Sequence, residues 1–225
     1  MSSSTRPSEV NRSHAETCPS TRALTHLPGC AILARIRGVH QVKREISGKL
    51  AHRLLAGRPT CLVTTRYRGE HNVMTLSWAC PISLVPPLLM LAIHPATHSH
   101  GLLLRGEECV LNIPARPLGE QLVRYGTRSG ADSDKLRESG VSVQAGHRVQ
   151  ALWIDDCLAH IECAVVERLA PGDHSLFIVE IVGAWAEEEA FTETWHVQDT
   201  PEDLLPVIHL GGSTYGLWGT EIQLG

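Results

Sequence analysis

Four short segments carry residue types that can bind a ligand or do chemistry, and the first runs from Asn72 to Pro87. Its sequence, NVMTLSWACPISLVPP, places the hydroxyls of Thr75 and Ser77 before a turn rich in small residues and prolines. Such a segment can bring backbone amides close to a flat, hydrogen-bonding ring while its apolar side chains cover one face of that ring. A plain strand–turn–strand has the same spacing, and the residues alone favour that simpler interpretation.

The second segment is HPATHSHG, where a strand gives way to a helix that we expect at His98 to Arg105. Thr97 and Ser99 place hydroxyls beside the free amides of a helix start, which together form a site for an anion such as phosphate. Ordinary helix capping explains the same residues.

The same segment offers three histidines, His94, His98 and His100. Zinc needs three or four convergent ligands, and no carboxylate or cysteine stands at a spacing that completes such a set. A metal- or haem-associated barrel that uses these histidines is therefore a weaker alternative.

The third and fourth segments are RSGADSDK and APGDHS. Lys135 is the only lysine after Lys49, and a lysine beside hydroxyls and glycine can neutralise a phosphate as a point charge. A solvated helix explains it equally well. Asp173 is a good turn-capping residue, whereas His174 is free to stack on a ligand, or to donate to one, near neutral pH.

The chain shows neither a G-x-S-x-G elbow nor a convincing Ser/His/Asp arrangement for a nucleophile. The chemistry is therefore expected to belong to a cofactor, with the protein supplying orientation.

The elements that must position these residues are mostly strands. The predicted strands are Cys61–Thr65, Asn72–Ala79, Leu88–Ile93, Cys109–Ile113, His160–Leu169 and Ser175–Glu187, and the two short helices are Leu118–Tyr125 and Ser133–Ser139. In the strand from His160 to Leu169, Ile161, Cys163 and Val165 alternate with His160, Glu162 and Val166, so the two sets face opposite ways. The absence of β-α-β alternation and of G-x-G-x-x-G argues against a Rossmann domain. The residues themselves predict a closed β-barrel with peripheral helices.

Bulk properties exclude several classes of protein. At 225 residues the chain suits one domain. Residues 1–58 carry a net charge of +7 and the remainder −11, so the acidic body argues against nucleic acid as a partner. No run of 18 or more apolar residues is present, which argues against a membrane span. Seven cysteines without a C-x-x-C pair predict buried thiols in a reducing cytoplasm.

The amino-terminal region differs from the rest. We expect residues 1–44 to be a disordered extension and residues 45–225 to form the domain. The Ser- and Arg-rich start also resembles an organelle transit peptide, which is a minor alternative. Between Glu45 and Leu55, Ile46, Leu50 and Leu54 recur every four residues, which predicts a helix packed on the domain.

The order of these motifs, rather than any single one, resembles the flavin reductase-like family, and within it the flavoredoxin branch. The resemblance runs from about Pro59 to Gly183, through N-x-M-T-x-S-W, P-P, THSHG, CVLNIPA, SGADSDK and GDHSLFIVEIV. It implies a mainly β fold, an FMN-binding split β-barrel with peripheral short helices. It also implies a homodimer with non-covalently bound FMN near the subunit interface, and NADH or NADPH as co-substrate.

The resemblance implies a role for each matching residue. The isoalloxazine ring would be lined by Met74, Thr75, Leu76 and Ser77. Ser99, with Thr97 and His98 near it, would meet the ribityl phosphate, and Lys135 would add charge there. His174, as the catalytic candidate, would lie by the nicotinamide or the flavin edge.

Two positions depart from the family pattern. Thr97 stands where relatives often carry arginine, which shifts phosphate binding towards Lys135, and Leu136 replaces a phenylalanine, which affects packing. The segment before Thr60 lies outside the resemblance, and residues 211–219 match it loosely.

The expected function is therefore hydride transfer from NAD(P)H to flavin, with reduced flavin passed to a partner oxygenase or another acceptor. The alternative is a flavoredoxin-like electron carrier without NAD(P)H oxidase activity of its own.

Overall fold

A computed structural model describes residues 57–198, 200–220 and 222, all within the second of two units, Ser47–Gly225. The predicted extension, residues 1–44, and the helix predicted at Glu45–Leu55 lie outside the described residues. No helix in the described part of the chain is long and apolar enough to cross a membrane.

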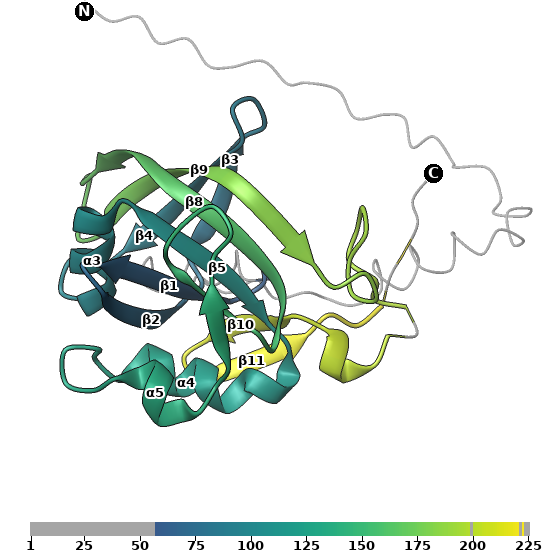
Figure 1. Cartoon of the computed structure of the whole chain (residues 1–225). Helices are drawn as coiled ribbons and strands as arrows, with labels where there is room; N and C mark the ends of the chain where they lie inside the picture. The colour runs from purple at the N-terminus through teal and green to yellow at the C-terminus, as the bar shows by residue number, and fades with distance from the viewer. Residues whose placement is uncertain (1–56, 199, 221, 223–225) are drawn as a thin grey trace, which may run out of the picture. The chain divides into compact units, whose positions relative to one another are not determined.

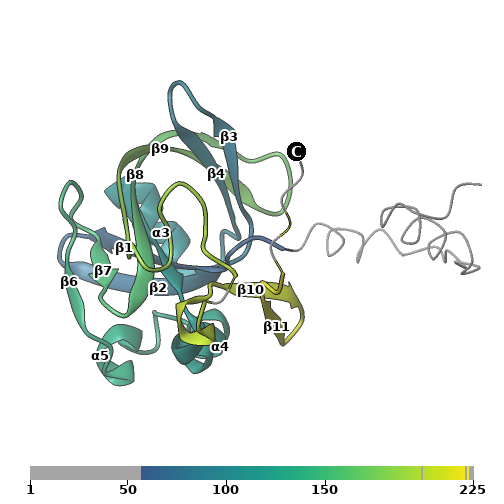
Figure 2. The same ribbon diagram turned by 90° about the vertical axis from the view of Figure 1, so that its right-hand side faces the viewer.

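Seven strands form the main sheet, in the order β2-β1-β5-β8-β9-β4-β3, with every neighbouring pair antiparallel. They are β1 (Cys61–Tyr67), β2 (Glu70–Leu76), β3 (Ala79–Ser83), β4 (Leu88–Ile93), β5 (Glu108–Pro114), β8 (Cys157–Leu169) and β9 (Ser175–Ala186). The sheet curls as a barrel, but its two ends, β2 and β3, are not paired with each other (Figures 1 and 2). The prediction of a closed barrel is corrected on this point, and the split barrel is confirmed.

Two small sheets and the helices lie around this barrel. The additional strands are β6 (Val143–Ala145) with β7 (Leu152–Ile154), and β10 (Val207–Gly211) with β11 (Thr214–Leu217). The helices are α3 (His98–Gly106), α4 (Gly119–Thr127) and α5 (Lys135–Ser139), with 3₁₀ turns η2 (Arg116–Leu118) and η3 (Glu202–Leu204).

Alternation along the strands separates an inner core from an outer one. Inside the barrel, Val63, Leu111 and Cys163 pack together with Leu103 of α3. Outside it, Leu62 and its neighbours pack under α4 and α5 in a second cluster. The alternation predicted for β8 is confirmed, because Ile161, Cys163 and Val165 all contact the inner core, whereas His160 and Glu162 do not belong to it.

The outward side of β8 carries a buried polar network that the sequence did not reveal. The Glu162 carboxylate accepts hydrogen bonds from the amides of His147 and Arg148, both at 2.6 Å, and from the Trp153 indole at 2.7 Å. The Trp153 ring is stacked on His160, with ring centroids 4.2 Å apart. Burial lowers the pKa of His160 to about 4, so this imidazole is neutral, and the network holds the β6–β7 hairpin against the barrel.

The predicted boundaries differ from the structure mainly around Trp78. Strand β2 ends at Leu76, and the segment predicted as a turn forms β3, whose partner is β4. The Trp78 carbonyl accepts from the Ala92 amide at 3.0 Å, so Ser77 and Trp78 connect β2 to β3 without leaving the sheet surface. The hairpins β6–β7 and β10–β11 were also missed, because each of their strands has only three to five residues.

Candidate functional site

The four residues predicted to line the flavin ring lie along β2 and just after it, on two different faces. Met74 packs against the inner core and Leu76 belongs to it. Thr75 faces the opposite way, and its hydroxyl donates to the Leu122 carbonyl of α4 at 2.6 Å. Because strand side chains alternate, these residues cannot present one common side-chain surface. Ser77, which follows the strand, is half-buried.

The backbone edge of β2, rather than its side chains, is the surface that suits a flat ring. This strand is the end of the sheet and has β1 as its only neighbour there. An edge strand presents a row of backbone N–H and C=O groups that the ladder leaves unpaired. A flat ring with hydrogen-bonding atoms along its rim is complementary to such an edge.

The start of α3 lies next to β2. Thr97 is the N-cap: its hydroxyl accepts from the His100 amide and donates to the His94 carbonyl at 2.9 Å. Ser99 is fully buried, and its hydroxyl accepts a hydrogen bond from the Asn72 side-chain amide at 2.8 Å. The structure therefore brings Ser99 to β2 and places it behind the surface of the site.

Gly130 brings a third segment, the loop before α5, against the bonded pair of Asn72 and Ser99. If Gly130 carried a Cβ atom, that atom would lie 2.1 Å from the Asn72 Oδ1, so the loop before α5 rests directly on the Asn72 carboxamide. Asn72 thus joins β2, α3 and this loop. It belongs to the N-x-M-T motif of the sequence, but no role had been assigned to it.

Lys135 holds the same loop from its other end. Its ammonium donates to the carbonyls of Tyr125 and Arg128, both at 3.1 Å, and the side chain is buried. Burial lowers the pKa of Lys135 to about 8. In the part of the chain that the structure describes, no carboxylate forms an ion pair with it, so the ammonium is bonded to backbone carbonyls and its charge is not neutralised by a side chain.

His174 lies at the β8–β9 turn in contact with two other rings. Its ring centroid is 4.9 Å from that of Trp78 and 5.2 Å from that of His94. Its Nδ1 is 2.8 Å from the Asp173 carboxylate, and this hydrogen bond holds the pKa of Asp173 below its usual value. The histidine tip of the late hairpin therefore meets the segment that follows β2, far away in sequence.

The three histidines of the THSHG region do not converge. His94 contacts His174, the His98 Nε2 is 2.7 Å from a Glu70 carboxylate oxygen, and the His100 Nε2 is 2.9 Å from the Ser175 hydroxyl. Among the described residues, no group of three or more histidine, cysteine, aspartate or glutamate side chains is placed to hold a metal. This geometry contradicts the alternative of a metal site at these histidines.

A cavity of about 820 Å³ lies beside this site rather than within it. None of the nine predicted site residues lines the cavity, and the segment Ala79–Pro81 of β3, directly after Trp78, forms one of its walls. Sequence reasoning missed it because its lining comes from six different strands and a late loop.

The fold and the clustered motifs define a split-barrel domain of the FMN-binding type. The model of the flavin reductase-like domain matches residues 53–212, well over half of the chain. The chain therefore belongs to the flavin reductase-like family.

Individual relatives agree with this assignment. An uncharacterized protein of Archaeoglobus fulgidus is 35% identical over 111 residues, which cover 49% of this chain and 63% of that protein, less than two thirds of it. The FMN-binding domain of a flavin reductases-like enzyme from Shewanella baltica has a TM-score of 0.70 at 26% identity, covering 82% of this chain and 100% of its own. Flavoredoxin from Methanosarcina acetivorans shares the fold, with a TM-score of 0.70 at 22% identity over 82% of this chain and 95% of its own.

The contact between Gly130 and Asn72 yields a prediction about the loop. In Gly130→Ala the new methyl group cannot fit against the carboxamide, so the loop should separate from β2. The Arg128 side chain is already exposed, and the released backbone around it should then fit a protease active site. We expect trypsin to cleave after Arg128 at least about 10-fold faster than in the wild type. Gly119→Ala is the matched control, because its added Cβ would meet nothing within 4 Å. Equal cleavage of both variants would contradict the packing described.

Proposed function

We propose that this protein is an FMN-binding oxidoreductase that transfers hydride from NADH or NADPH to bound flavin. The observation that carries the proposal is the meeting of Trp78 and His174 next to the free edge of β2 and the start of α3. All of these elements lie inside the region that matches the family model. The Shewanella baltica domain, whose description names FMN, supports the choice of flavin.

The chain's own residues divide the work of holding FMN. The backbone edge of β2, from Met74 to Ser77, would bind the polar rim of the ring, and Trp78 would cover part of its face. The first-turn amide of His98 would bind the phosphate, because it has no intrahelical partner. Ser99 is buried and would hold this turn against β2 through its hydrogen bond with Asn72. Lys135 would supply the positive charge. When bound, FMN would supply the hydride-accepting chemistry, which no side chain of the site provides.

His174 would act at the outer side of the ring. The Asp173 carboxylate can only accept, so His174 donates from Nδ1, and in the neutral imidazole Nε2 is then the acceptor. The imidazole would then meet a nicotinamide or the flavin edge, with the Trp78 ring packed against it.

FMN should shift the absorption spectrum and raise the melting temperature of the protein. Lys135 should make the affinity for FMN depend on pH. Its pKa of about 8 means that the ammonium is lost as pH rises through this value. FMN affinity should therefore fall above pH 8, whereas riboflavin affinity, without a phosphate to bind, should not. Lys135→Met should bind FMN at least about 10-fold more weakly, from a charge-assisted bond of about 1.5–3 kcal/mol, and lose the pH dependence.

Arg137→Met is the control for that variant, since Arg137 is an exposed cation on the same helix. The phosphate assignment is wrong if Lys135→Met weakens FMN and riboflavin equally. A colourless protein whose melting temperature FMN does not change would refute flavin binding itself.

The flavoredoxin-like motifs favour a second function, an electron carrier without NAD(P)H oxidase activity. Anaerobic stopped-flow mixing of the FMN-loaded protein with NADH and with NADPH separates the two. We expect the flavin absorbance near 450 nm to bleach within seconds with at least one nicotinamide, and His174→Ala to slow bleaching at least about 10-fold at unchanged FMN content. No bleaching with either nicotinamide would leave the carrier function in place of the reductase.

We further infer a homodimer in the cytoplasm, passing reduced flavin to a partner oxygenase or another acceptor. The five described cysteines are free thiols, which suits a reducing compartment. The β3–β4 connection projects from the sheet (Figure 2) and exposes 88% of Leu84 and 92% of Val85. Exposed apolar residues grouped on one projection are typical of a contact surface.

Sedimentation tests the dimer. We expect wild-type protein at about 10 µM to sediment as a dimer, and a Leu84→Ser, Val85→Ser double variant to sediment as a monomer, because burial of these side chains would no longer be favourable. Val166→Ser, another exposed apolar position, should leave the dimer intact. A wild-type monomer would disprove the dimer, and a dimeric double variant would disprove the role of this projection.

A further inference from the structure

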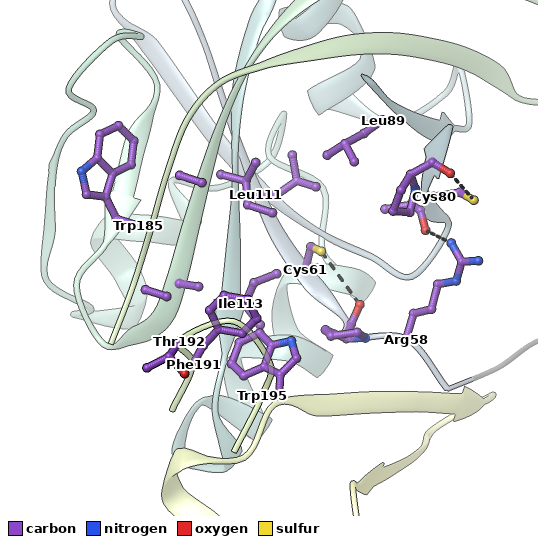
Figure 3. Close-up of a pocket in the computed structure, with 17 residues that line it drawn as sticks. Arg58, Cys61, Cys80, Leu89, Leu111, Ile113, Trp185, Phe191, Thr192 and Trp195 are labelled. Atoms are coloured by element: carbon purple, nitrogen blue, oxygen red, sulfur yellow. Dashed lines mark hydrogen bonds between the residues drawn. The ribbon is translucent and has the colours of Figure 1, made fainter. Parts of the chain in front are cut away.

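The cavity of about 820 Å³ is a chamber inside the open side of the barrel. Leu111, Ile113 and Cys61 form its floor, and the segment Ala79–Pro81 of β3 and the loop after β9 form opposite walls (Figure 3). Its volume falls in the range of about 300–1,000 Å³ that small-molecule sites occupy. The chamber is therefore large enough for a ligand of one or two rings.

Aromatic side chains form the wall contributed by the loop after β9. The Phe191 and Trp195 rings meet edge to face, with centroids 5.2 Å apart and planes at 67°. The loop is held by its own backbone bonds: the Phe191 amide donates to the Glu187 carbonyl, and the His196 amide to the Ala190 carbonyl, both at 2.9 Å. The aromatic wall is thus preformed, and its rings favour a flat apolar partner.

The charged groups around the chamber also restrict which ligand it can bind. Among the residues that the structure describes, Arg58 is the only one in the lining with a permanent charge, and none of the lining residues is a carboxylate. The guanidinium lies at the rim, where it donates to the Ala79 carbonyl at 3.4 Å (Figure 3), and it forms no ion pair with any described residue. Burial raises the pKa of Cys61 to about 12, so the thiol in the floor stays neutral. An apolar chamber with one cation at its mouth is complementary to a flat molecule with one anionic group.

We propose that this chamber binds a planar aromatic monoanion of one or two rings, such as an aromatic carboxylate. The ring lies against Phe191 and Trp195 over the apolar floor, and the carboxylate meets Arg58 at the rim. A guanidinium binds a carboxylate with two parallel hydrogen bonds, which fixes the orientation of the ring. The site is separate from the residues proposed to hold FMN, and the proposal does not depend on hydride transfer.

Other ligand classes fit less well. A nucleotide or sugar needs many hydrogen-bonding partners, and the floor of Leu111, Ile113 and Cys61 offers almost none. A neutral apolar ring fits the walls but leaves the Arg58 charge unused. The chamber therefore selects its ligand by both the anionic group and the flat ring.

The probe is 2-naphthoate, titrated by calorimetry into the purified protein with and without saturating FMN. We expect saturable binding of one molecule per chain in both cases. Arg58→Gln should weaken 2-naphthoate at least about 10-fold and leave the neutral 2-acetylnaphthalene unchanged, because only the charge-assisted bond is lost. Arg168→Gln, at an exposed position on β8 outside the chamber, should bind both molecules as the wild type does.

A second variant tests the chamber itself. Ala184 lines it from an exposed position, so Ala184→Leu fills space without disturbing the core, and it should weaken both probes. Ala145→Leu, an exposed position on β6, should weaken neither. FMN content should be the same in all four variants, so loss of the flavin site and loss of this site are separately visible.

Four results would overturn the proposal. If 2-naphthoate does not bind saturably, the chamber does not bind an aromatic anion. The same conclusion follows if Arg58→Gln lowers the affinity for both probes equally. Competition between 2-naphthoate and FMN would assign the chamber to the flavin ring. If the wild type binds neither probe and Ala184→Leu dissociates a dimer, the chamber is instead a contact surface between two copies of the chain.

Discussion

One buried hydrogen bond joins the three pieces of chain on which the candidate site depends. Asn72 of β2 donates to Ser99 of α3, and the loop that leads to Lys135 rests on the same carboxamide at Gly130. Both side chains are out of water, so an unpaired Asn72 amide would cost about 1–3 kcal/mol. The bond therefore sets the position of the α3 start against the edge of β2, and with it the spacing between a phosphate site and a ring site.

The position of β2 at the end of the sheet determines which part of this strand can bind a ligand. Its inward side chains belong to the barrel core and Thr75 anchors α4, so both faces are already in use. What remains is the backbone edge, which can bind any planar, hydrogen-bonding ring regardless of side-chain identity. Beyond this edge the chain turns through Trp78 into β3. The candidate flavin site therefore borders β2, and the aromatic chamber borders β3, the next strand along the chain.

Much of this could be predicted from the sequence, and the reasons for the failures are physical. The long hairpin β8–β9 was predicted because strict alternation over many residues has one interpretation. The strands β6, β7, β10 and β11 are too short for a periodic signal, and the Glu162 network joins residues whose pairing depends on the finished barrel. The resemblance implied that Met74, Thr75, Leu76 and Ser77 line one ring, and strand geometry divides their side chains between two faces. Asn72 and Trp78 drew no assignment, because their importance comes from contacts with distant segments.

The central claim is that flavin lies along the edge of β2, with its phosphate at the start of α3. A crystal structure of the protein with FMN tests it most directly. We expect the ring between the β2 backbone and the Trp78–His174 pair, and the phosphate within hydrogen-bond distance of the His98 amide. A flavin ring found in the chamber against Trp195, with its phosphate at Arg58, would contradict the account.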